Sequence, residues 1–297
     1  MQMEYSADDI AAAKNLQSLT YLATSMVAFW TYDYACSLHT EWTFLLESRW
    51  TKAKGLYVIT RHSPFFFLLT ELYLHFTPSE KLDEYKCGIS FTLHTSFSTI
   101  SIGCSELFFV LRTYALWNNN RIVLAVMLSA FLAAVAACIV IGFITVGTSH
   151  VVTSAIPGIT GCYRTSTNLS FIQFLLLFAF QLGLISLTLI RVIQSWRTNN
   201  GPLYAILVKH NIFYYASGLF LSAVNFLMLF YDSAYHSIIE DFECFVLAIL
   251  ATRMYLLLWQ IDRDAHGSDA LGMICLSDMF PADPMAYPAS FVERNLD

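Results

Sequence analysis

The chain has 297 residues, of which 57% are hydrophobic and only 13% are charged, whereas soluble proteins carry about 25% charged residues. A formal net charge of -6 excludes the strongly basic surface of nucleic-acid-binding proteins, so we expect no nucleic-acid partner. The apolar residues gather into stretches of about 20 or more, separated by short polar connectors. This pattern is typical of an all-α polytopic membrane helix bundle in a lipid bilayer, and not of a β-barrel with its short alternating segments.

Seven apolar segments predict seven transmembrane helices, each about as long as a hydrocarbon core of about 30 Å requires. Together they form a predicted transmembrane domain over residues 1–261, followed by a flexible acidic cytoplasmic tail over residues 262–297. The second segment has the most interruptions, among them Arg61, Pro64 and Glu71. The seven predicted spans are residues 18–40, 55–76, 88–116, 121–147, 169–193, 205–231 and 242–260.

The distribution of lysine and arginine predicts the orientation of the bundle, because short loops with more positive charge stay in the cytoplasm. One set of connectors carries nine of these residues and the opposite set carries four. We therefore expect the N-terminus outside and the C-terminus in the cytoplasm, in the plasma membrane or a membrane of the secretory pathway. The nine are Arg49, Lys52, Lys54, Arg112, Arg121, Arg191, Arg197, Lys209 and Arg263, and the four are Lys14, Lys81, Lys86 and Arg164.

Two cysteines fall on the predicted outer side, where an oxidising compartment favours disulfides. Cys87 lies at the outer end of the third span, and Cys162 lies in the outer loop between the fourth and fifth spans. We expect a disulfide bond between them, with two free thiols as the alternative. A bridge between these two places is typical of G-protein-coupled receptors, which the chain resembles in architecture. The same loop contains a glycosylation sequon at Asn168, which we expect to lie too close to the fifth span for use.

Charged residues within the predicted spans indicate which helices meet. A charge at the bilayer centre costs about 2.5 to 3.5 kcal/mol and is usually retained only beside a partner or a cavity. With a rise of about 1.5 Å per residue, Asp33 and Arg61 lie roughly 10 Å and roughly 9 Å from the inner ends of the first two spans. Their equal depth predicts an ion pair between adjacent antiparallel helices, with a proton or ion relay as the alternative.

The same reasoning gives two further sets of residues. Glu106 in the third span and Arg253 in the seventh form a second predicted pair toward the inner half of the bundle. Glu71 and His94 lie in the outer halves of the second and third spans, where the ligand cavity of a seven-helix bundle would open. We expect these two residues either to hydrogen-bond between neighbouring helices or to line such a cavity.

A run of polar and aromatic residues near the N-terminus extends over about residues 21–62 and resembles the signature of a known family. The residues that carry the resemblance are Tyr32, Asp33, Glu41, Trp50, Lys54 and Arg61. The run resembles the N-terminal signature of a large fungal family of seven-helix integral membrane proteins of unknown function. The resemblance implies membrane residence and a seven-helix layout, with Glu41, Trp50 and Lys54 in a cytoplasmic hairpin between the first two helices. His62 stands where that family usually has a tyrosine.

The sequence contains no enzyme motif that we identify. Its eight histidines form no HExxH set, and the seventh span has none, unlike the seven-helix zinc hydrolases. We therefore expect a non-enzymatic protein without catalytic residues, cofactor or metal. The preferred interpretation is a receptor-like protein that senses an unknown ligand from the outer side and has a cytoplasmic signalling partner. A transporter or channel subunit that uses the intramembrane charges, and a structural or trafficking membrane protein, remain the alternatives.

Overall fold

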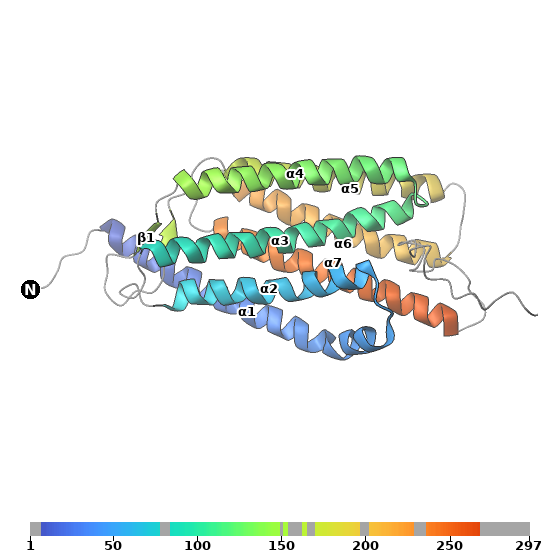
Figure 1. The fold of residues 1–297 in the computed structure, drawn as a ribbon, viewed down its shortest axis with the longest axis horizontal. Coiled ribbons are helices and arrows are strands. Elements are labelled where there is room, and N and C mark those ends of the chain that lie inside the picture. Colours follow the sequence, from blue (N-terminus) through green and yellow to red (C-terminus); the bar gives the residue numbers. More distant parts are fainter. Residues whose placement is uncertain are drawn as a thin grey trace, which may run out of the picture.

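A computed structural model describes residues 7–77, 84–148, 151–153, 162–164, 170–196, 202–228 and 236–267 of the chain. These residues form an all-α bundle of seven helices that run side by side along one long axis (Figure 1). The all-α, seven-helix architecture expected from the sequence is confirmed. The helices are α1 (Ala7–Glu47), α2 (Lys52–Phe76), α3 (Glu84–Leu116), α4 (Arg121–Thr148), α5 (Ser170–Trp196), α6 (Pro202–Met228) and α7 (His236–Gly267).

A short antiparallel ribbon lies at the end of the bundle where α3 begins (Figure 1). Its strands are β1 (Val151–Thr153) and β2 (Cys162–Arg164), and Thr153 is paired with Cys162. Strand β1 also contacts α3. Part of the connector between α4 and α5 is therefore held against the third helix.

Four of the described helices are long and apolar enough to cross a membrane. Helix α6 contains a shorter apolar stretch, Ile212–Met228, and α1 and α2 are long enough but less apolar than the four candidate spans. Both α1 and α2 contribute charged side chains to the interior of the bundle, which lowers their mean hydropathy. The four candidate spans are Tyr85–Leu116 in α3, Arg121–Thr145 in α4, Ile172–Gln194 in α5 and Ile238–Ile261 in α7.

Several helices extend beyond the spans that hydropathy predicts. Helix α1 covers Ala7–Glu47 instead of 18–40, and α7 continues past residue 261 to Gly267. Once a helix is nucleated, adding a residue at its end requires little free energy, so its ends follow capping and packing more than hydropathy. Residues 268–297, which make up most of the predicted tail, lie outside the described part of the chain.

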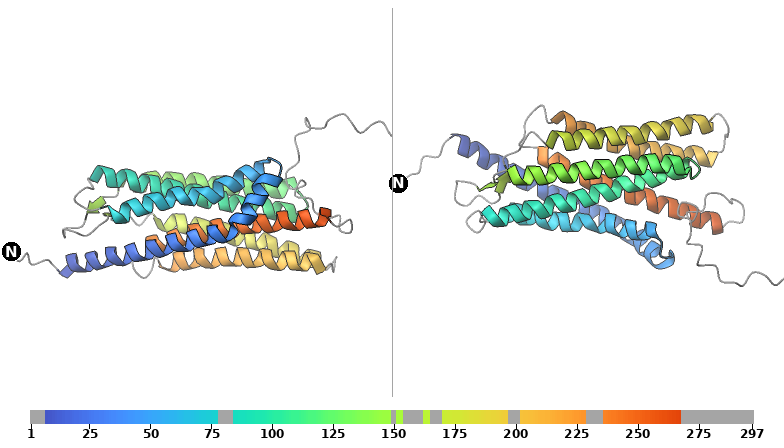
Figure 2. Two further views of the ribbon diagram at one scale, coloured as in Figure 1. Left: turned by 90° about the horizontal axis from the view of Figure 1, so that it is seen from below. Right: turned by 45° about the horizontal axis from the view of Figure 1, so that its top comes forward.

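Helices α3 and α7 occupy the centre of the bundle, which Figure 2 shows from two further sides. Helix α3 contacts α2, α4, α5 and α7, and α7 contacts α1, α2, α3 and α6. In the apolar stretch of α7, 67% of the residues are buried, against 6% in α4. The outward surface of α4 is apolar, with Ile122, Val126 and Phe143 between 61% and 76% exposed. Soluble proteins rarely leave such a face open to water, so it fits contact with lipid.

Two aromatic clusters form the core where α1, α2 and α7 meet. In the first, the centroid of the Phe44 ring lies 4.9 Å from that of Tyr57 and 5.5 Å from that of Tyr255. In the second, the Trp30 ring lies 5.6 Å from the Phe245 ring. Aromatic pairs of this kind contribute about 0.5–1.5 kcal/mol beyond the burial of their area. Along α1 the two clusters lie on either side of a polar level, which holds the charged residues described below.

The connector between α1 and α2 is closed by Lys54, whose side chain is buried. Its ammonium group donates hydrogen bonds of 2.8 Å to the carbonyl oxygens of Leu45 and Ser48 at the end of α1. Thr51 caps α2 by accepting a hydrogen bond from the Lys54 backbone nitrogen at 3.2 Å, and Lys54 Nζ lies 4.6 Å from the Trp50 ring. A cation at the C-terminal end of a helix also interacts favourably with the helix dipole. Trp50 and Lys54 thus lie in a tight hairpin between the first two helices.

Candidate functional site

Asp33 of α1 and Arg61 of α2 lie together inside the bundle. Arg61 Nη1 donates a hydrogen bond to Asp33 Oδ2 at 2.8 Å. The Arg61 side chain is 1% exposed and the Asp33 side chain 5%. The structure therefore brings together the two residues whose equal depth predicts a pair. Because removing one partner would leave a buried charge uncompensated, this contact ties α1 to α2.

A second carboxylate of α1 contacts the same guanidinium group. Arg61 Nη2 lies 2.6 Å from Glu41 Oε1 and donates to Ser37 Oγ at 2.5 Å, and Ser37 donates to Glu41 at 2.5 Å. Asp33, Ser37 and Glu41 follow one another at intervals of four residues, which places them on one face of a helix. Glu41 thus lies within α1 and contacts Arg61, whereas the family resemblance implies a place for it in the hairpin.

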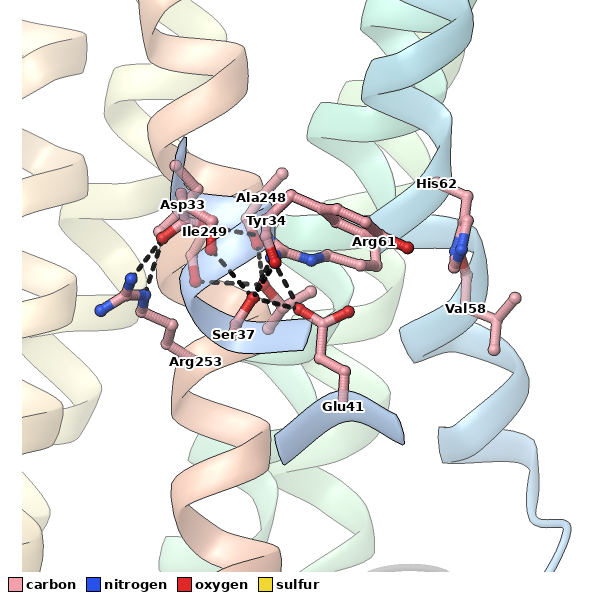
Figure 3. A network of polar contacts seen from close by, with 11 residues as sticks. Asp33, Tyr34, Ser37, Glu41, Val58, Arg61, His62, Ala248, Ile249 and Arg253 are labelled. Atoms are coloured by element: carbon pink, nitrogen blue, oxygen red, sulfur yellow. Dashed lines mark hydrogen bonds and ion pairs between the residues drawn. The ribbon is translucent and has the colours of Figure 1, made fainter. Parts of the chain in front are cut away.

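Arg253 of α7 reaches the other oxygen of Asp33, so that Asp33 lies between two arginines (Figure 3). Its Nε donates to Asp33 Oδ1 at 2.9 Å, and its Nη2 contacts the same oxygen. The Arg253 side chain is 51% exposed, so this end of the network opens to the surface of the bundle. We refer to Asp33, Ser37, Glu41, Arg61 and Arg253 as the clamp. Its two carboxylates and two guanidinium groups balance in charge, which favours a structural ion pair over a relay.

The predicted pair of Glu106 and Arg253 is wrong. Arg253 pairs with Asp33 of α1, and Glu106 instead accepts a hydrogen bond from Gln181 Nε2 of α5 at 2.5 Å. The prediction used depth along the helices, but the rotation of each helix about its own axis decides which neighbour a side chain reaches. Arg253 faces α1, and Glu106 faces α5.

Two aromatic rings cover the guanidinium group of Arg61. Its Cζ lies 5.0 Å from the centroid of the Trp30 ring and 5.2 Å from that of Tyr34. Such cation–π contacts contribute about 2 kcal/mol when they are desolvated. The neighbouring His62 instead contacts its own helix, where Nδ1 lies 2.9 Å from the Val58 carbonyl oxygen (Figure 3). The departure from the family pattern at His62 therefore does not alter the clamp.

Glu71 and His94 form part of a second polar cluster, in which α2 and α3 meet α7. His94 Nε2 lies 2.7 Å from Glu71 Oε2 and 3.5 Å from Asp241 Oδ1. Glu71 Oε1 also lies 2.8 Å from Nε2 of His75, one turn further along α2. We call Glu71, His75, His94 and Asp241 the His94 cluster. The structure brings Glu71 and His94 into contact across the interface between α2 and α3. Neither residue lines the cavity near Glu106 or the open groove on α2 and α3, which are described below.

A chain of polar side chains links α3 with α5, α6 and α7. Glu106 binds Gln181, and Gln181 Oε1 accepts a hydrogen bond from Ser222 Oγ at 2.7 Å. Ser222 Oγ and Asn225 Nδ2 both donate to the carboxyl group of Glu243. All five side chains belong to buried residues. The hydrogen-bond partners of both carboxyl groups in this chain are neutral, in contrast to those in the clamp.

A cavity of about 110 Å³ lies among α3, α4 and α5, with Glu240 of α7 also in its lining, and we call it the Glu106 cavity. Glu106 and Glu240 bring carboxyl groups to its lining, and Phe131, Phe174 and Phe180 contribute aromatic rings. Glu106 Oε2 is buried and has no hydrogen-bond partner among the described residues. Leaving a buried acceptor unpaired costs about 1–3 kcal/mol, so this oxygen marks a place for a donor. A separate, open groove lies on α2 and α3, and Lys86 is among the residues that line it.

The cysteines divide into two groups. Cys87 is not a free thiol and lies fully buried near the start of α3. Cys162 begins strand β2, whose partner strand contacts α3, while its side chain and the Asn168 sequon lie outside what the structure describes. The cysteines present as free thiols in the described part are Cys36, Cys104, Cys138 and Cys244.

The sequence reasoning did not identify Ser37, Gln181, Asp241 or Glu243 as site residues. Serine and glutamine add no charge to a span, so they give no signal on a charge-based scale. Asp241 and Glu243 lie at the edge of the predicted seventh span, where charged residues are common. The structure shows that both residues face neighbouring helices, because α7 lies at the centre of the bundle and begins at His236, before the predicted span.

Comparison with known protein families relates the N-terminal part of the chain to one of them. Residues 21–66 match a family of unknown function, DUF6533. No curated protein matches the chain. The matched segment contains four of the five clamp residues, namely Asp33, Ser37, Glu41 and Arg61. The chain is thus similar to this family in the segment that builds the α1 and α2 part of the clamp, and Arg253 joins from outside that segment.

Proposed function

We propose that this chain is a non-enzymatic, receptor-like protein whose seven helices cross the membrane and which binds a small amine in the Glu106 cavity. The observation that carries the proposal is that Glu106, a lining residue of that cavity, has a buried carboxyl oxygen, Oε2, without a hydrogen-bond partner among the described residues. A ligand that donates a hydrogen bond to this oxygen removes the cost of leaving a buried acceptor unpaired. The interaction is stronger if the donor is charged, because charge-assisted hydrogen bonds are about twice as strong as neutral ones.

The composition of the lining favours an amine over other donors. Glu106 and Glu240 contribute two carboxyl groups, and the lining residues of this cavity include no lysine or arginine. The rings of Phe131, Phe174 and Phe180 offer an apolar surface to the rest of the ligand. Ligand sites commonly combine an apolar wall with a few placed polar groups. The volume of about 110 Å³ restricts the enclosed part of the ligand to a few heavy atoms.

Seven crossings are supported by the way the less apolar helices pack. Helices α1, α2 and α6 run beside the four candidate spans (Figure 1), and the charged groups of α1 and α2 are paired inside the bundle. Pairing of this kind is how membrane helices retain charged residues. The excess of lysine and arginine in one set of connectors supports an outside N-terminus. A signalling partner in the cytoplasm would then meet those connectors.

A disulfide bond between Cys87 and Cys162 belongs to the same proposal. Cys87 is buried at the head of α3 and is not a free thiol. Cys162 is the first residue of strand β2, and its partner strand β1 contacts α3. A bond there would tie the connector between α4 and α5 to the third helix on the oxidising side of the membrane.

Ligand-dependent thermal stability of the full-length protein in detergent tests the amine site. Benzylamine and benzyl alcohol are matched probes, because they differ only in the donor group. Benzylamine is expected to raise the unfolding midpoint of the wild type, with about 2.7 kcal/mol of stabilisation at 100 times its Kd. Benzyl alcohol is expected to have a smaller effect. Equal shifts in the wild type and in Glu106→Gln would exclude the proposed role of Glu106.

Two control variants separate the site from general effects. Glu47→Gln removes an exposed carboxylate that pairs with Arg263, and the benzylamine shift is expected to persist. Gly103→Leu fills the cavity, because Gly103 is in its lining and a Cβ there meets no atom within 4 Å. This variant keeps Glu106 but is expected to lose the benzylamine shift.

A proton-coupled transporter is the second candidate function. The chain of hydrogen bonds from Glu106 through Gln181 and Ser222 to Glu243 favours it, because both carboxyl groups have neutral partners. Helix α2, however, continues through Pro64, so it is not the discontinuous helix that transporters often use. Proteoliposomes loaded with a pH-sensitive dye would reveal proton flux, which Glu243→Gln should abolish. Absence of both flux and amine binding would point to a structural or trafficking role.

A further inference from the structure

Three ligand-type side chains converge where α2, α3 and α7 meet. Glu71, His94 and Asp241 each offer one atom, and these atoms lie within 4.8 Å of one another. Each residue belongs to a different helix, so the packing of the bundle fixes its position. Glu71 is 4% exposed and Asp241 is 2% exposed, so both carboxyl groups are removed from solvent.

His94 approaches both carboxyl groups closely through one ring nitrogen. Its Nε2 lies 2.7 Å from Glu71 Oε2 and 3.5 Å from Asp241 Oδ1, yet it has no hydrogen-bond partner among the described residues. A ring nitrogen at 2.7 Å from an oxygen donates no hydrogen bond when the oxygen lies away from the N–H direction or when that nitrogen carries no hydrogen. The His94 nitrogen thus lies beside both carboxyl groups, and one ligand atom from each of the three residues lies within 4.8 Å of the others, close enough for one ion to be bound after small side-chain shifts.

Electrostatics also favours a cation at this point. The carboxyl groups of Glu71 and Asp241 approach each other in a buried place, where two negative charges repel strongly. A divalent ion neutralises both carboxylates at once. The His94 imidazole can then remain neutral and supply a nitrogen ligand, which is its usual role at a metal.

The ligand types distinguish between classes of metal ion. Calcium takes about six to eight oxygen ligands, and magnesium keeps several waters, so neither suits one imidazole and two carboxylates. Imidazole nitrogen suits zinc and its neighbours among the transition metals. We propose that Glu71, His94 and Asp241 bind one divalent transition-metal ion, for which Zn²⁺ is the best probe. Three protein ligands leave one position of a tetrahedral zinc ion open to water or another ligand.

Neighbouring residues support such a site. His75 Nε2 lies 2.8 Å from Glu71 Oε1, the oxygen that does not face His94, and so it orients the Glu71 carboxylate. Asp241 lies close to the start of α7 and Glu71 close to the end of α2, roughly 8 Å from those helix ends. An ion therefore has a short path from the end of the bundle to the site, and once bound it ties three helices together there.

Zinc titration of the full-length protein tests the proposal. The protein is purified without a histidine tag, treated with EDTA, dialysed and titrated with Zn²⁺ by calorimetry. The expected result is one Zn²⁺ per chain, with affinity reduced at least tenfold in His94→Gln and in Asp241→Asn. His75→Ala, which removes only the orienting group, is expected to weaken binding by about 10–100-fold. Absence of stoichiometric binding in the wild type, or unchanged affinity in both ligand variants, would overturn the proposal.

Two further measurements keep the test independent of variant folding and of the amine proposal. X-ray absorption of zinc bound to the wild type should show only nitrogen and oxygen ligands at about 2.0–2.2 Å, and sulfur ligation would overturn the assignment. Glu106→Gln and His62→Ala lie outside the cluster and should retain wild-type zinc affinity. Since Glu106→Gln should lose only the benzylamine response, failure of the metal site and failure of the amine site give different results.

Discussion

Arg61 of α2 and Glu41 of α1 lie 2.6 Å apart, from Nη2 to Oε1, with side chains only 1% and 4% exposed. The same guanidinium group binds Asp33 at 2.8 Å through Nη1. One buried arginine therefore contacts two carboxylates of a single helix face. Residues 33–41 of α1, a little over two helical turns, are thereby fixed against α2, which makes Arg61 the residue on which the clamp depends most.

Replacing Arg61 by alanine is expected to lower the free energy of unfolding by about 3–5 kcal/mol, because Asp33 and Glu41 lose a buried partner. Arg61→Lys should also destabilise, since one ammonium group does not reproduce the two separate nitrogen contacts. The unfolding midpoint in detergent measures both effects. As a control, Arg263→Ala breaks an exposed ion pair of 3.2 Å with Glu47 and should cost at most about 1 kcal/mol. Similar losses for the two alanine variants would contradict the clamp.

Arg253→Ala should destabilise the protein much less than Arg61→Ala. The Arg253 side chain is 51% exposed, so solvent screens its interaction with Asp33, and the expected loss is about 1 kcal/mol. Asp33 keeps Arg61 in this variant, so the pairing of α1 with α2 should persist. Hydrogen–deuterium exchange should rise in α7 around residue 253 and stay unchanged in α2. Faster exchange in α2 would show that Arg253 has a larger role.

Lys54→Met should loosen the hairpin between α1 and α2. Methionine has a similar length but leaves the carbonyl oxygens of Leu45 and Ser48 without their donor, at an expected cost of about 1–3 kcal/mol. The matched control is Lys52→Met, two residues earlier, whose side chain is exposed. Thermal unfolding should separate the two variants, and equal midpoints would indicate that the buried ammonium group contributes nothing to the hairpin.

Cysteine accessibility tests both the orientation and the proposed disulfide bond. An impermeant maleimide applied to intact cells should label Cys87 and Cys162 only after gentle reduction, read from a tagged protein and its single-cysteine variants. The reason is that both sulfurs are expected on the outer side and in one bond. Labelling of Cys162 without reduction would show a free thiol. Failure to label either cysteine after reduction would indicate the opposite orientation or burial.

The sequence predicted the elements that depend on hydropathy and depth. Seven apolar segments predicted seven helices, and the equal depth of Asp33 and Arg61 predicted residues that the structure places together. The family resemblance implied a place for Glu41 in the hairpin between the first two helices. Helix α1 in fact continues to Glu47, which turns Glu41 toward Arg61. The end of a helix depends on local capping, which hydropathy does not measure.

The direction in which each side chain points around its helix axis explains why Arg253 does not pair with Glu106. At about 100° per residue, the ten positions from Glu243 to Arg253 place these side chains about 80° apart around α7. Glu243 consequently contacts α6, whereas Arg253 contacts α1. Depth alone cannot distinguish these directions. The Glu106 cavity was not predicted for a related reason, because it depends on how the side chains of three helices fill the space between them.

Helix α7 carries Asp241, Glu243 and Arg253, which contact α3, α6 and α1 respectively. A continuous helix is nearly rigid along its axis, so these three residues keep fixed spacings of about 1.5 Å per position. A slide or rotation of α7 would therefore disturb the His94 cluster, the hydrogen bonds from Glu243 to Ser222 and Asn225, and the clamp in a single movement. A ligand or ion that shifted α7 at one of these places would therefore alter the contacts at the other two, along a helix that runs from one end of the bundle toward its middle.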